Sequence, residues 1–366
     1  TGGHDKSEWV VTMGRNTQLI PIADKTAYKR DKAAIFFESW RARKMSFGAV
    51  MVRLFMRMTI KRQIHKDQAL DPVELRAMVD KQAGRMKWPD FIDVEEVSAN
   101  GVRALWVTPP DAHPDKVFYY LHGGGYVFCA PDTTHKDLIW RLAVACKCKV
   151  LAIDYRLAPE NPFPAAIEDS VAGYRYLLDQ GYDAGAIGIG GDSAGGGLTF
   201  GSLFQFKEEG LPLPACAVGL SPWTDLLATG ETVQTNLKSD LLIPGDKIAE
   251  LAQMYYADSD PRIPQASPLY GDYTGMPPTL IQVSDVEVLL DDSRRLAAKI
   301  DAAGVPVALD VWHNLPHVWQ AISRFLPEGR AAIKDIGMFV RGHLRAKPRA
   351  IEDQNAAAKL LPQAAE

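Results

Sequence analysis

Short apolar runs alternate with helix-forming stretches along most of this chain, and this order constrains the fold more than any other feature. Eight runs have the length and the β-branched or aromatic content of strands, at 92–97, 104–107, 117–121, 150–153, 187–189, 217–220, 279–283 and 307–311. Helical stretches separate most of the later runs, at 136–147, 164–179, 194–209, 290–303 and 329–344. Strands that alternate with helices favour a parallel sheet covered on both faces. We predict an α/β fold with a mostly parallel, eight-stranded sheet that begins with a meander.

Two stretches depart from this alternation. Residues 1–85 are helical in character, with hardly any strand signal, and Asp71 with Glu74 forms a capping-box pattern at the start of one helix. Residues 226–273 also lack a strand signal, and an inserted helix at 246–256 is more plausible there than a long loop. We therefore divide the chain into an N-terminal helical segment (1–85), two core parts (86–225 and 274–345), an insertion (226–273) and a frayed tail (346–366).

Composition excludes several classes of function. The 366 residues include 41 basic and 45 acidic side chains, a net charge of -4, which predicts no nucleic-acid partner. The four cysteines match neither a disulfide framework nor a zinc site, and we expect them to be small apolar groups in the core.

Membrane spans and targeting segments are not predicted either. The most apolar stretch, 47–60, is too short to span a bilayer and contains Arg53 and Arg57, so we expect no stable membrane insertion. The first nine residues are polar and do not resemble a signal peptide, which makes a cytoplasmic location the expectation. Met13 is an alternative natural start.

Residues 191–195, Gly-Asp-Ser-Ala-Gly, carry the clearest chemical signal. They follow the strand at 187–189 and precede a helix, which is the context of a nucleophile elbow. In so tight a turn, side chains two positions either side of Ser193 would clash, so both positions must be glycine. The serine hydroxyl then stands exposed above the sheet, and Ser193 is the candidate nucleophile.

A second motif, His-Gly-Gly-Gly-Tyr at 122–126, follows the strand at 117–121. Glycines let backbone N–H groups approach a substrate without an obstructing Cβ atom. Two N–H groups of this loop, together with that of Ala194, are expected to bind the oxyanion of a tetrahedral intermediate. The ring of His122 is expected to brace the loop.

A serine nucleophile needs a base, and the base needs a carboxylate that orients it. Of the eight histidines, only His313 and His317 directly follow a late strand, whose carboxyl end lies at the same edge of the sheet as the elbow. His317 is placed to reach Ser193. His313, at the end of the strand, is expected to be structural.

Four carboxylates compete for the orienting role, all shortly after the strand at 279–283. Asp291 and Asp292 stand at a helix start, where the helix dipole favours negative charge, so they have a structural explanation. Asp285 follows the strand directly, and Glu287 lies in the turn beyond it. The spacing of these residues leaves both open.

Taken together, the motifs resemble those of the bacterial hormone-sensitive-lipase-like family of α/β-hydrolase carboxylesterases. Beside the two glycine motifs, the resemblance over about 70–345 rests on Tyr-Arg-Leu-Ala-Pro-Glu at 155–160, Ser-Pro-Trp-Thr-Asp-Leu at 221–226 and Leu-Pro-His-Val-Trp at 315–319. It implies the α/β-hydrolase fold, with Ser193 as nucleophile, His317 as base, and Gly124, Gly125 and Ala194 as oxyanion donors. The family's acid motif, acid-x-Leu-x-Asp, fits only 287–291, so the resemblance implies Glu287 as the acid in place of the commoner aspartate.

The resemblance further implies a helical cap built from 1–85 and 226–273. Four residues would then roof the acyl site, with ordinary helix packing and membrane-surface contact as the alternatives for them: Phe47, Met51, Phe55 and Met58.

The expected function is hydrolysis of short- to medium-chain acyl esters through an acyl-enzyme. The expected partner is a small-molecule ester, and no metal or organic cofactor is required. A related amidase, lactonase or natural-product deacylase, and a non-catalytic small-molecule binder on the same fold, are the alternatives. Homo-oligomerisation is left open.

Overall fold

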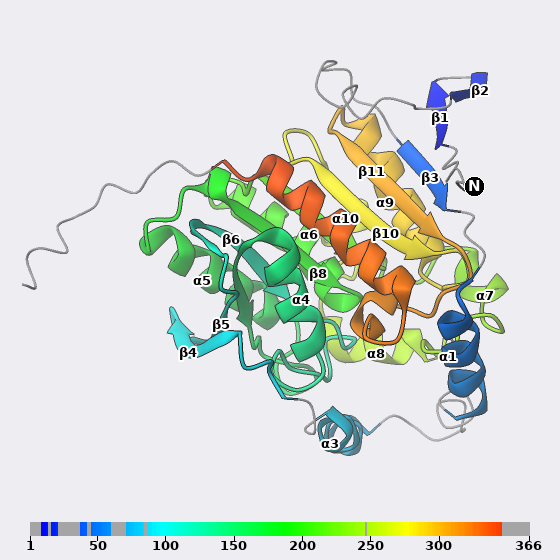
Figure 1. Ribbon diagram of the computed structural model, residues 1–366, viewed down its shortest axis with the longest axis horizontal. Coiled ribbons are helices and arrows are strands. Elements are labelled where there is room, and N and C mark those ends of the chain that lie inside the picture. Colours follow the sequence, from blue (N-terminus) through cyan, green and yellow to red (C-terminus); the bar gives the residue numbers. More distant parts are fainter. Residues whose placement is uncertain are drawn as a thin grey trace, which may run out of the picture.

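The computed structural model describes residues 9–13, 16–20, 37–41, 45–59, 71–83, 87–245 and 247–345. At its centre is one sheet with helices on both faces (Figure 1). All eight strands predicted from the sequence are present: β4 (Asp93–Ala99), β5 (Val102–Thr108), β6 (His113–Leu121), β7 (Cys148–Ile153), β8 (Ile187–Asp192), β9 (Cys216–Leu220), β10 (Thr279–Ser284) and β11 (Val307–Trp312).

The eight strands lie in the order β4-β5-β7-β6-β8-β9-β10-β11. Strand β5 pairs antiparallel with both β4 and β7. The predicted opening meander is therefore wrong beyond the β4–β5 hairpin, because β7 and not the consecutive strand β6 lies next to β5. All pairs from β7 to β11 are parallel. Parallel strands bring their carboxyl ends to one edge of the sheet, so the loops after β6, β8, β10 and β11 converge there.

The five predicted helices cover the two faces of this sheet (Figure 1). Helices α4 (Lys136–Cys146) and α10 (Pro327–His343) pack on one face, where one apolar cluster lies between them and the strands. Helices α5 (Ala165–Asp179), α6 (Ala194–Glu208) and α9 (Leu290–Ala302) pack on the other, over a larger apolar cluster. The strands are therefore buried on both sides, which explains why several of them are apolar throughout.

The insertion between β9 and β10 consists of short helical pieces separated by turns and coil where the structure describes it. It contains α7 (Thr232–Thr235), α8 (Ile248–Tyr256) and the 3₁₀ turn η3 (Pro268–Tyr270). Helix α8 coincides with the helix expected at 246–256, although residue 246 lies outside the described residues. Two further 3₁₀ turns, η2 (Ala184–Ala186) and η4 (Trp319–Ile322), precede β8 and follow β11.

The N-terminal segment contains helices α1 (Phe47–Met58) and α3 (Pro72–Ala83). The carboxylate of Asp71 caps α3 by accepting the N–H groups of Val73 and Glu74 at 2.8 and 3.2 Å, as the capping pattern predicted. No helix in the described part of the chain is long and apolar enough to cross a membrane.

The expectation that residues 1–85 hold hardly any strand was wrong for their first half. Strands β1 (Trp9–Met13), β2 (Asn16–Ile20) and β3 (Phe37–Arg41) extend the sheet beyond β11 to eleven strands. Strand β3 pairs parallel with β11, whose edge would otherwise present unpaired N–H and C=O groups. These segments are short and rich in β-branched or aromatic residues, a feature that the helical spacing further along obscured. The expected frayed tail, 346–366, lies outside the described residues.

Candidate active site

The elbow at Ser193 has the geometry that its sequence predicted. Strand β8 ends at Asp192 and helix α6 begins at Ala194, so Ser193 alone makes the turn. Its φ is 54° and its ψ is -121°, a conformation that costs energy for a residue with a Cβ atom. A Cβ atom on Gly191 would lie 2.4 Å from the carbonyl oxygen of Leu121, and one on Gly195 2.1 Å from the same oxygen. Both positions therefore require glycine.

The glycine loop after β6 lies beside this turn. Gly124 has a φ of 118°, and a Cβ atom on it would lie 2.0 Å from the carbonyl oxygen of Phe128, so only glycine fits. The N–H groups of Gly124, Gly125 and Ala194 donate no hydrogen bond to any other described residue. That of Ala194 opens helix α6, where the helix dipole favours negative charge. Three backbone donors are thus available to an anion.

A buried carboxylate ties the elbow to the glycine loop. Asp192 Oδ1 accepts the N–H of Gly123 at 3.0 Å and the hydroxyl of Tyr120, while Oδ2 lies 3.2 Å from His135 Nε2. Burial opposes the charge, but His135 and these hydrogen bonds outweigh it and lower the pKa of Asp192. The backbone beside the candidate oxyanion donors is therefore held by a carboxylate on the elbow itself.

His122 braces the same loop, as expected. Its ring stacks on Tyr155 with the centroids 4.2 Å apart, and its Nδ1 lies 2.7 Å from the carbonyl oxygen of Gly123. The Tyr155 hydroxyl donates to the His122 carbonyl oxygen at 2.6 Å. Burial lowers the pKa of His122 to about 3, so its ring is neutral near pH 7.

His317 pairs with Glu287. The distance between His317 Nδ1 and Glu287 Oε2 is 2.5 Å, and both side chains are buried. Glu287 Oε1 accepts the N–H of Ser284 at 2.7 Å and the hydroxyl of Ser221 at 2.9 Å. His317 Nε2 is buried without a hydrogen-bond partner among the described residues. One nitrogen of the ring is thus held by a carboxylate and the other is available for chemistry.

Burial and pairing act in opposite directions on this pair. Burial favours the uncharged form of both groups, and it raises the pKa of Glu287. For His317 the attraction of the Glu287 carboxylate outweighs burial, so the pKa of the imidazole is raised above 6.5. Glu287 thereby favours a proton on His317.

Asp285 makes a separate pair. Its Oδ2 lies 2.6 Å from His313 Nδ1, and its Oδ1 accepts the N–H of Asn314 at 2.7 Å. Between the two carboxylates that spacing left open, the geometry therefore distinguishes clearly, because Glu287 contacts His317 and Asp285 contacts His313.

The other two carboxylates bind backbone N–H groups at the start of the insertion. Asp291 accepts the N–H of Thr232 at 3.0 Å, and Asp292 accepts those of Thr224 and Asp225 at 2.8 and 2.9 Å. Their role is therefore structural, as expected, and these hydrogen bonds add to their favourable position in the first turn of α9.

The end of β9 connects Ser193 to the His317–Glu287 pair. The N–H of Ser193 donates to the carbonyl oxygen of Leu220 at 2.8 Å, and the next residue, Ser221, donates its hydroxyl to Glu287. Sequence reasoning gave Ser221 no role of its own. Its φ of 46°, unusual for serine, and its place directly after a strand are the features that set it apart.

Side chains from α8 and α3 contact the glycine loop. Leu251 of α8 would lie 3.4 Å from a Cβ atom on Gly125, and the rings of Tyr255 and Tyr126 stack with their centroids 3.6 Å apart. Arg76 of α3 donates to the carbonyl oxygens of Val127 and Ala158, at 2.6 Å each, and pairs with Glu160.

Two charged residues of the 155–160 motif have structural partners. Glu160 pairs with Arg76, and Arg156 pairs with Asp169 and Glu168. This agrees with their expected structural role. Arg76 itself was missed, because a single arginine on a predicted helix carries no mark of its partner in the sequence.

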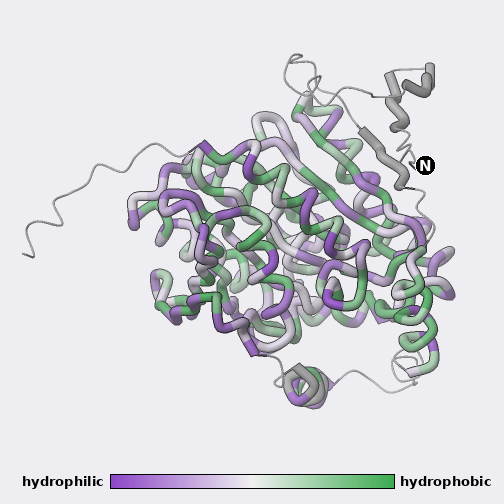
Figure 2. Tube along the Cα trace, in the orientation of Figure 1, coloured by the Kyte–Doolittle hydropathy of each residue, from purple (hydrophilic) through white to green (hydrophobic). Residues whose placement is uncertain are grey.

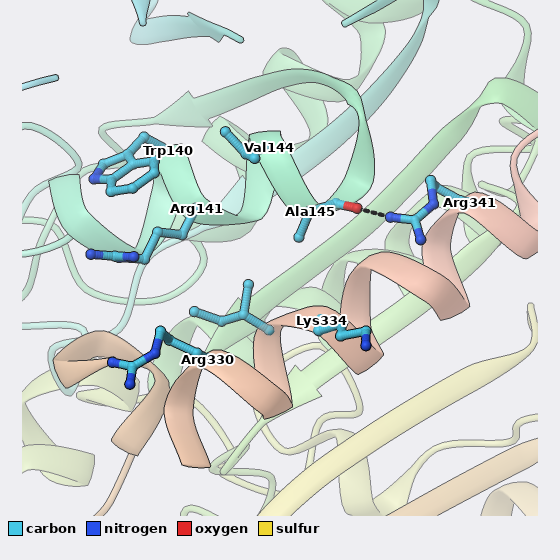
Figure 3. Close-up of a pocket in the computed structure, with 8 residues that line it drawn as sticks. Trp140, Arg141, Val144, Ala145, Arg330, Lys334 and Arg341 are labelled. Carbon is cyan, nitrogen blue, oxygen red and sulfur yellow. Dashed lines mark hydrogen bonds between the residues drawn. The ribbon is translucent and has the colours of Figure 1, made fainter. Parts of the chain in front are cut away.

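A groove between α4 and α10 lies apart from these residues (Figure 3). It has a volume of about 260 Å³ and is lined by Trp140, Arg141, Val144, Ala145, Arg330, Ile333, Lys334 and Arg341. No candidate catalytic residue lines it, so it is not the candidate active site.

Comparison with known proteins agrees with this geometry. A family model described as the alpha/beta hydrolase fold matches residues 118–321. The crystal structure of an esterase from the bacterial hormone-sensitive lipase family superposes with a TM-score of 0.77 at 42% identity, over 83% of this chain and 100% of that chain. The chain belongs to this family of α/β hydrolases.

Two curated relatives of this hormone-sensitive-lipase-like hydrolase show the same likeness. An acetyl-hydrolase from Streptomyces hygroscopicus is 44% identical over 246 residues, which cover 67% of this chain and 81% of the relative. An esterase from Acinetobacter venetianus is 31% identical over 298 residues, which cover 81% of this chain and 98% of the relative.

Proposed function

We propose that this carboxylic ester hydrolase cleaves short- to medium-chain acyl esters with Ser193 as nucleophile, His317 as general base and Glu287 as orienting acid. Relatives named acetyl-hydrolase and esterase support ester hydrolysis as the class of reaction. The observation that carries the triad is the buried 2.5 Å contact between His317 Nδ1 and Glu287 Oε2, opposite an Nε2 atom with no partner among the described residues.

In the first half of the reaction, His317 Nε2 takes the hydroxyl proton of Ser193 while Oγ attacks the ester carbonyl carbon. The carbonyl oxygen becomes an oxyanion, and the N–H groups of Gly124, Gly125 and Ala194 donate to it. When the tetrahedral intermediate collapses, the bond to the alcohol oxygen breaks. The proton on His317 passes to that oxygen, and the alcohol leaves.

In the second half, water replaces the alcohol. His317 takes a proton from the water as it attacks the acyl-enzyme, and a second tetrahedral intermediate forms in the same donor set. Collapse of this intermediate returns the proton to Ser193 and releases the carboxylic acid. Glu287 stays ionised throughout, where it holds the Nδ1–H tautomer and stabilises the imidazolium that forms in both halves.

The preference for short and medium acyl chains is proposed from the side chain that faces the glycine loop. Leu251 is buried against Gly125, and α8, which carries it, is fastened by the stacked rings of Tyr255 and Tyr126. A leucine held beside an oxyanion donor limits the space next to the reacting carbonyl. Each acyl methylene that does not fit a pocket costs on the order of 1–3 kcal/mol of discrimination.

The test is hydrolysis of p-nitrophenyl esters from acetate to palmitate by the wild type and by Ser193→Ala. We expect kcat/KM to peak at short or medium chains, and turnover to disappear in the variant while its circular dichroism spectrum is unchanged. A folded wild type that hydrolyses none of the esters, or a peak at palmitate, would refute the proposal.

A further inference from the structure

Helix α1 is apolar on two opposite faces. Its inner face, with Ala49, Val52 and Met56, packs against the molecule, and Ala49 belongs to the apolar cluster that also holds Trp312 and Trp319. Its outer face lies toward solvent, and Figure 2 shows the helix as largely hydrophobic at the rim of the molecule. A helix that is apolar all round is ordinarily buried on all sides.

The outer face is large for a solvent-exposed surface. Five residues of α1 at helical spacing and one from the turn before α10 expose 47–81% of their surface, namely Phe47, Met51, Leu54, Phe55, Met58 and Phe325. Phe325 lies close by, because its carbonyl oxygen would be 2.7 Å from a Cβ atom on Gly48. The expectation that four of these side chains, Phe47, Met51, Phe55 and Met58, roof an acyl site stays a prediction. Contiguous exposed apolar patches mark protein or membrane contacts.

Helix α1 is firmly attached to the rest of the molecule. The N–H and hydroxyl of Ser46 donate to the two carboxylate oxygens of Glu328 at 2.7 and 2.9 Å, and Ser46 Oγ also accepts the N–H of Ala49 at 3.1 Å. On the inner face, Arg53 interacts electrostatically with Asp285 and Asp240. The outer face is therefore presented by a fixed helix whose inner side packs against the protein.

The charge around α1 indicates what covers its outer face. The stretch 39–66 contains eight Lys and Arg residues and no Asp or Glu, although the whole chain has a net charge of -4. Arg57 is exposed on the helix itself. Four more cations stand within four residues of the helix ends in the sequence, at 43, 44, 61 and 62.

We propose that α1 docks this hydrolase in the plane of an anionic lipid surface. In-plane amphipathic helices combine bulky apolar side chains with flanking Lys and Arg, which anionic headgroups attract. A second copy of the chain fits less well, because a two-fold contact through α1 would bring the two basic stretches together. A 12-residue helix is also only about 18 Å long, and its face alone is short of the roughly 800 Å² per partner of a stable interface.

Docking in this way would bring the candidate active site close to the lipid. The inner face of α1 contacts the cluster of Trp312, Leu315 and Trp319, and the last two bracket His317 in the chain. Esters dissolved in the membrane would then meet the enzyme at its bound side. The inference concerns binding, and its test does not depend on the proposed triad.

The test is flotation of the full chain with vesicles of phosphatidylcholine, with and without phosphatidylglycerol. We expect the wild type to float only with the anionic vesicles, and added salt to weaken its binding. The double variant Phe47→Ser/Phe55→Ser should bind at least about tenfold more weakly, because it lacks two phenyl rings that would enter the lipid in the bound state. Arg57→Glu should weaken binding about tenfold or more, because it reverses one charge near the surface.

Met51→Ser and Met338→Ser form a matched control, since the two methionines are similarly exposed, at 47% and 49%, but Met338 lies on α10. Only Met51→Ser should weaken binding, and circular dichroism should show both variants folded. Wild-type chain that does not float with anionic vesicles, or a Phe47→Ser/Phe55→Ser variant that binds like wild type, overturns the proposal. The proposal is also overturned if sedimentation shows that the wild type is a dimer and the double variant a monomer, because a second copy then covers the outer face of α1.

Discussion

The hydroxyl of Ser221 donates to the carboxylate of Glu287 at 2.9 Å, at the oxygen that does not contact His317. The two oxygens of Glu287 are therefore used differently, one by His317 and one by Ser221 and the N–H of Ser284. Since all these groups are buried, each hydrogen bond helps to keep the carboxylate ionised and correctly turned.

Replacing Ser221 by alanine should therefore weaken the triad without removing it. One hydrogen bond to a buried carboxylate is lost, so we expect kcat to fall about 5- to 30-fold while KM stays nearly constant. Ser202→Ala is the control, because it also removes a buried hydroxyl, one that donates to Ser170 at 2.7 Å. Steady-state kinetics on a p-nitrophenyl ester would contradict this account of Ser221 if both variants lost kcat equally.

The two carboxylates after β10 should differ sharply in their effect on turnover. Glu287→Gln keeps the shape but removes the charge that orients His317, and we expect kcat/KM to fall by about 10³–10⁴. Asp285→Asn removes a charge that faces His313 and Arg53 and does not contact His317, so we expect less than about a tenfold loss. A larger loss for Asp285→Asn than for Glu287→Gln would show that Asp285 is the acid.

The pH dependence of kcat/KM should reflect the pairing of His317 with Glu287. His317 must be neutral to act as a base, and the Glu287 carboxylate raises its pKa above 6.5. The midpoint of the acidic limb of the profile should therefore lie above pH 6.5 in the wild type and at lower pH in Glu287→Gln. A limb that stays in place in Glu287→Gln would mean that Glu287 does not act on the titrating group.

Leu251 should set the limit on acyl length. Leu251→Ala removes the side chain against Gly125, so we expect kcat/KM for p-nitrophenyl octanoate relative to butyrate to rise about tenfold. Gln253→Ala, an exposed position on the same helix, should leave the ratio unchanged. An unchanged ratio in Leu251→Ala would place the limiting contact elsewhere.

Asp292 should make stability depend on pH. Burial raises its pKa from 3.8 to about 7, and the nearby charge of Asp225 adds to this. Because the folded pKa is the higher one, protonation stabilises the fold at low pH, and that stabilisation is lost as the pH rises through about 7. An asparagine side chain does not titrate, so the free energy of unfolding of Asp292→Asn relative to wild type should increase between pH 4 and pH 8, by at most about 4 kcal/mol. Denaturant titrations at both pH values measure this difference in the free energy of unfolding. The same difference at pH 4 and pH 8 would contradict the raised pKa of Asp292.

The sheet and its five covering helices were predictable because their signals are local. Each of the eight strands is a short apolar run, and each helix shows its own periodicity. The elbow and the glycine loop were predictable for another reason, since close backbone approach at Gly191, Gly195 and Gly124 leaves glycine as the only fit.

Contacts between distant segments were not predictable from residue patterns. Spacing alone left Asp285 and Glu287 equivalent, because it does not show which carboxylate turns toward His317. The contacts of Arg76 with the loop after 126 and of Ser221 with Glu287 join segments tens of residues apart, and neither partner marks the other. Strands β1 to β3 depend on the edge of β11, which exists only once the sheet has formed.

The central claim is that Ser193 forms the covalent acyl intermediate, and labelling by a phosphonate ester tests it most directly. Such a probe phosphonylates an activated serine and mimics the tetrahedral intermediate. We predict a single adduct on the tryptic peptide that contains Ser193, loss of esterase activity in step with labelling, and no adduct in Ser193→Ala. An adduct on a different residue that abolishes activity, or full activity in a wild type whose Ser193 is completely labelled, would contradict the account.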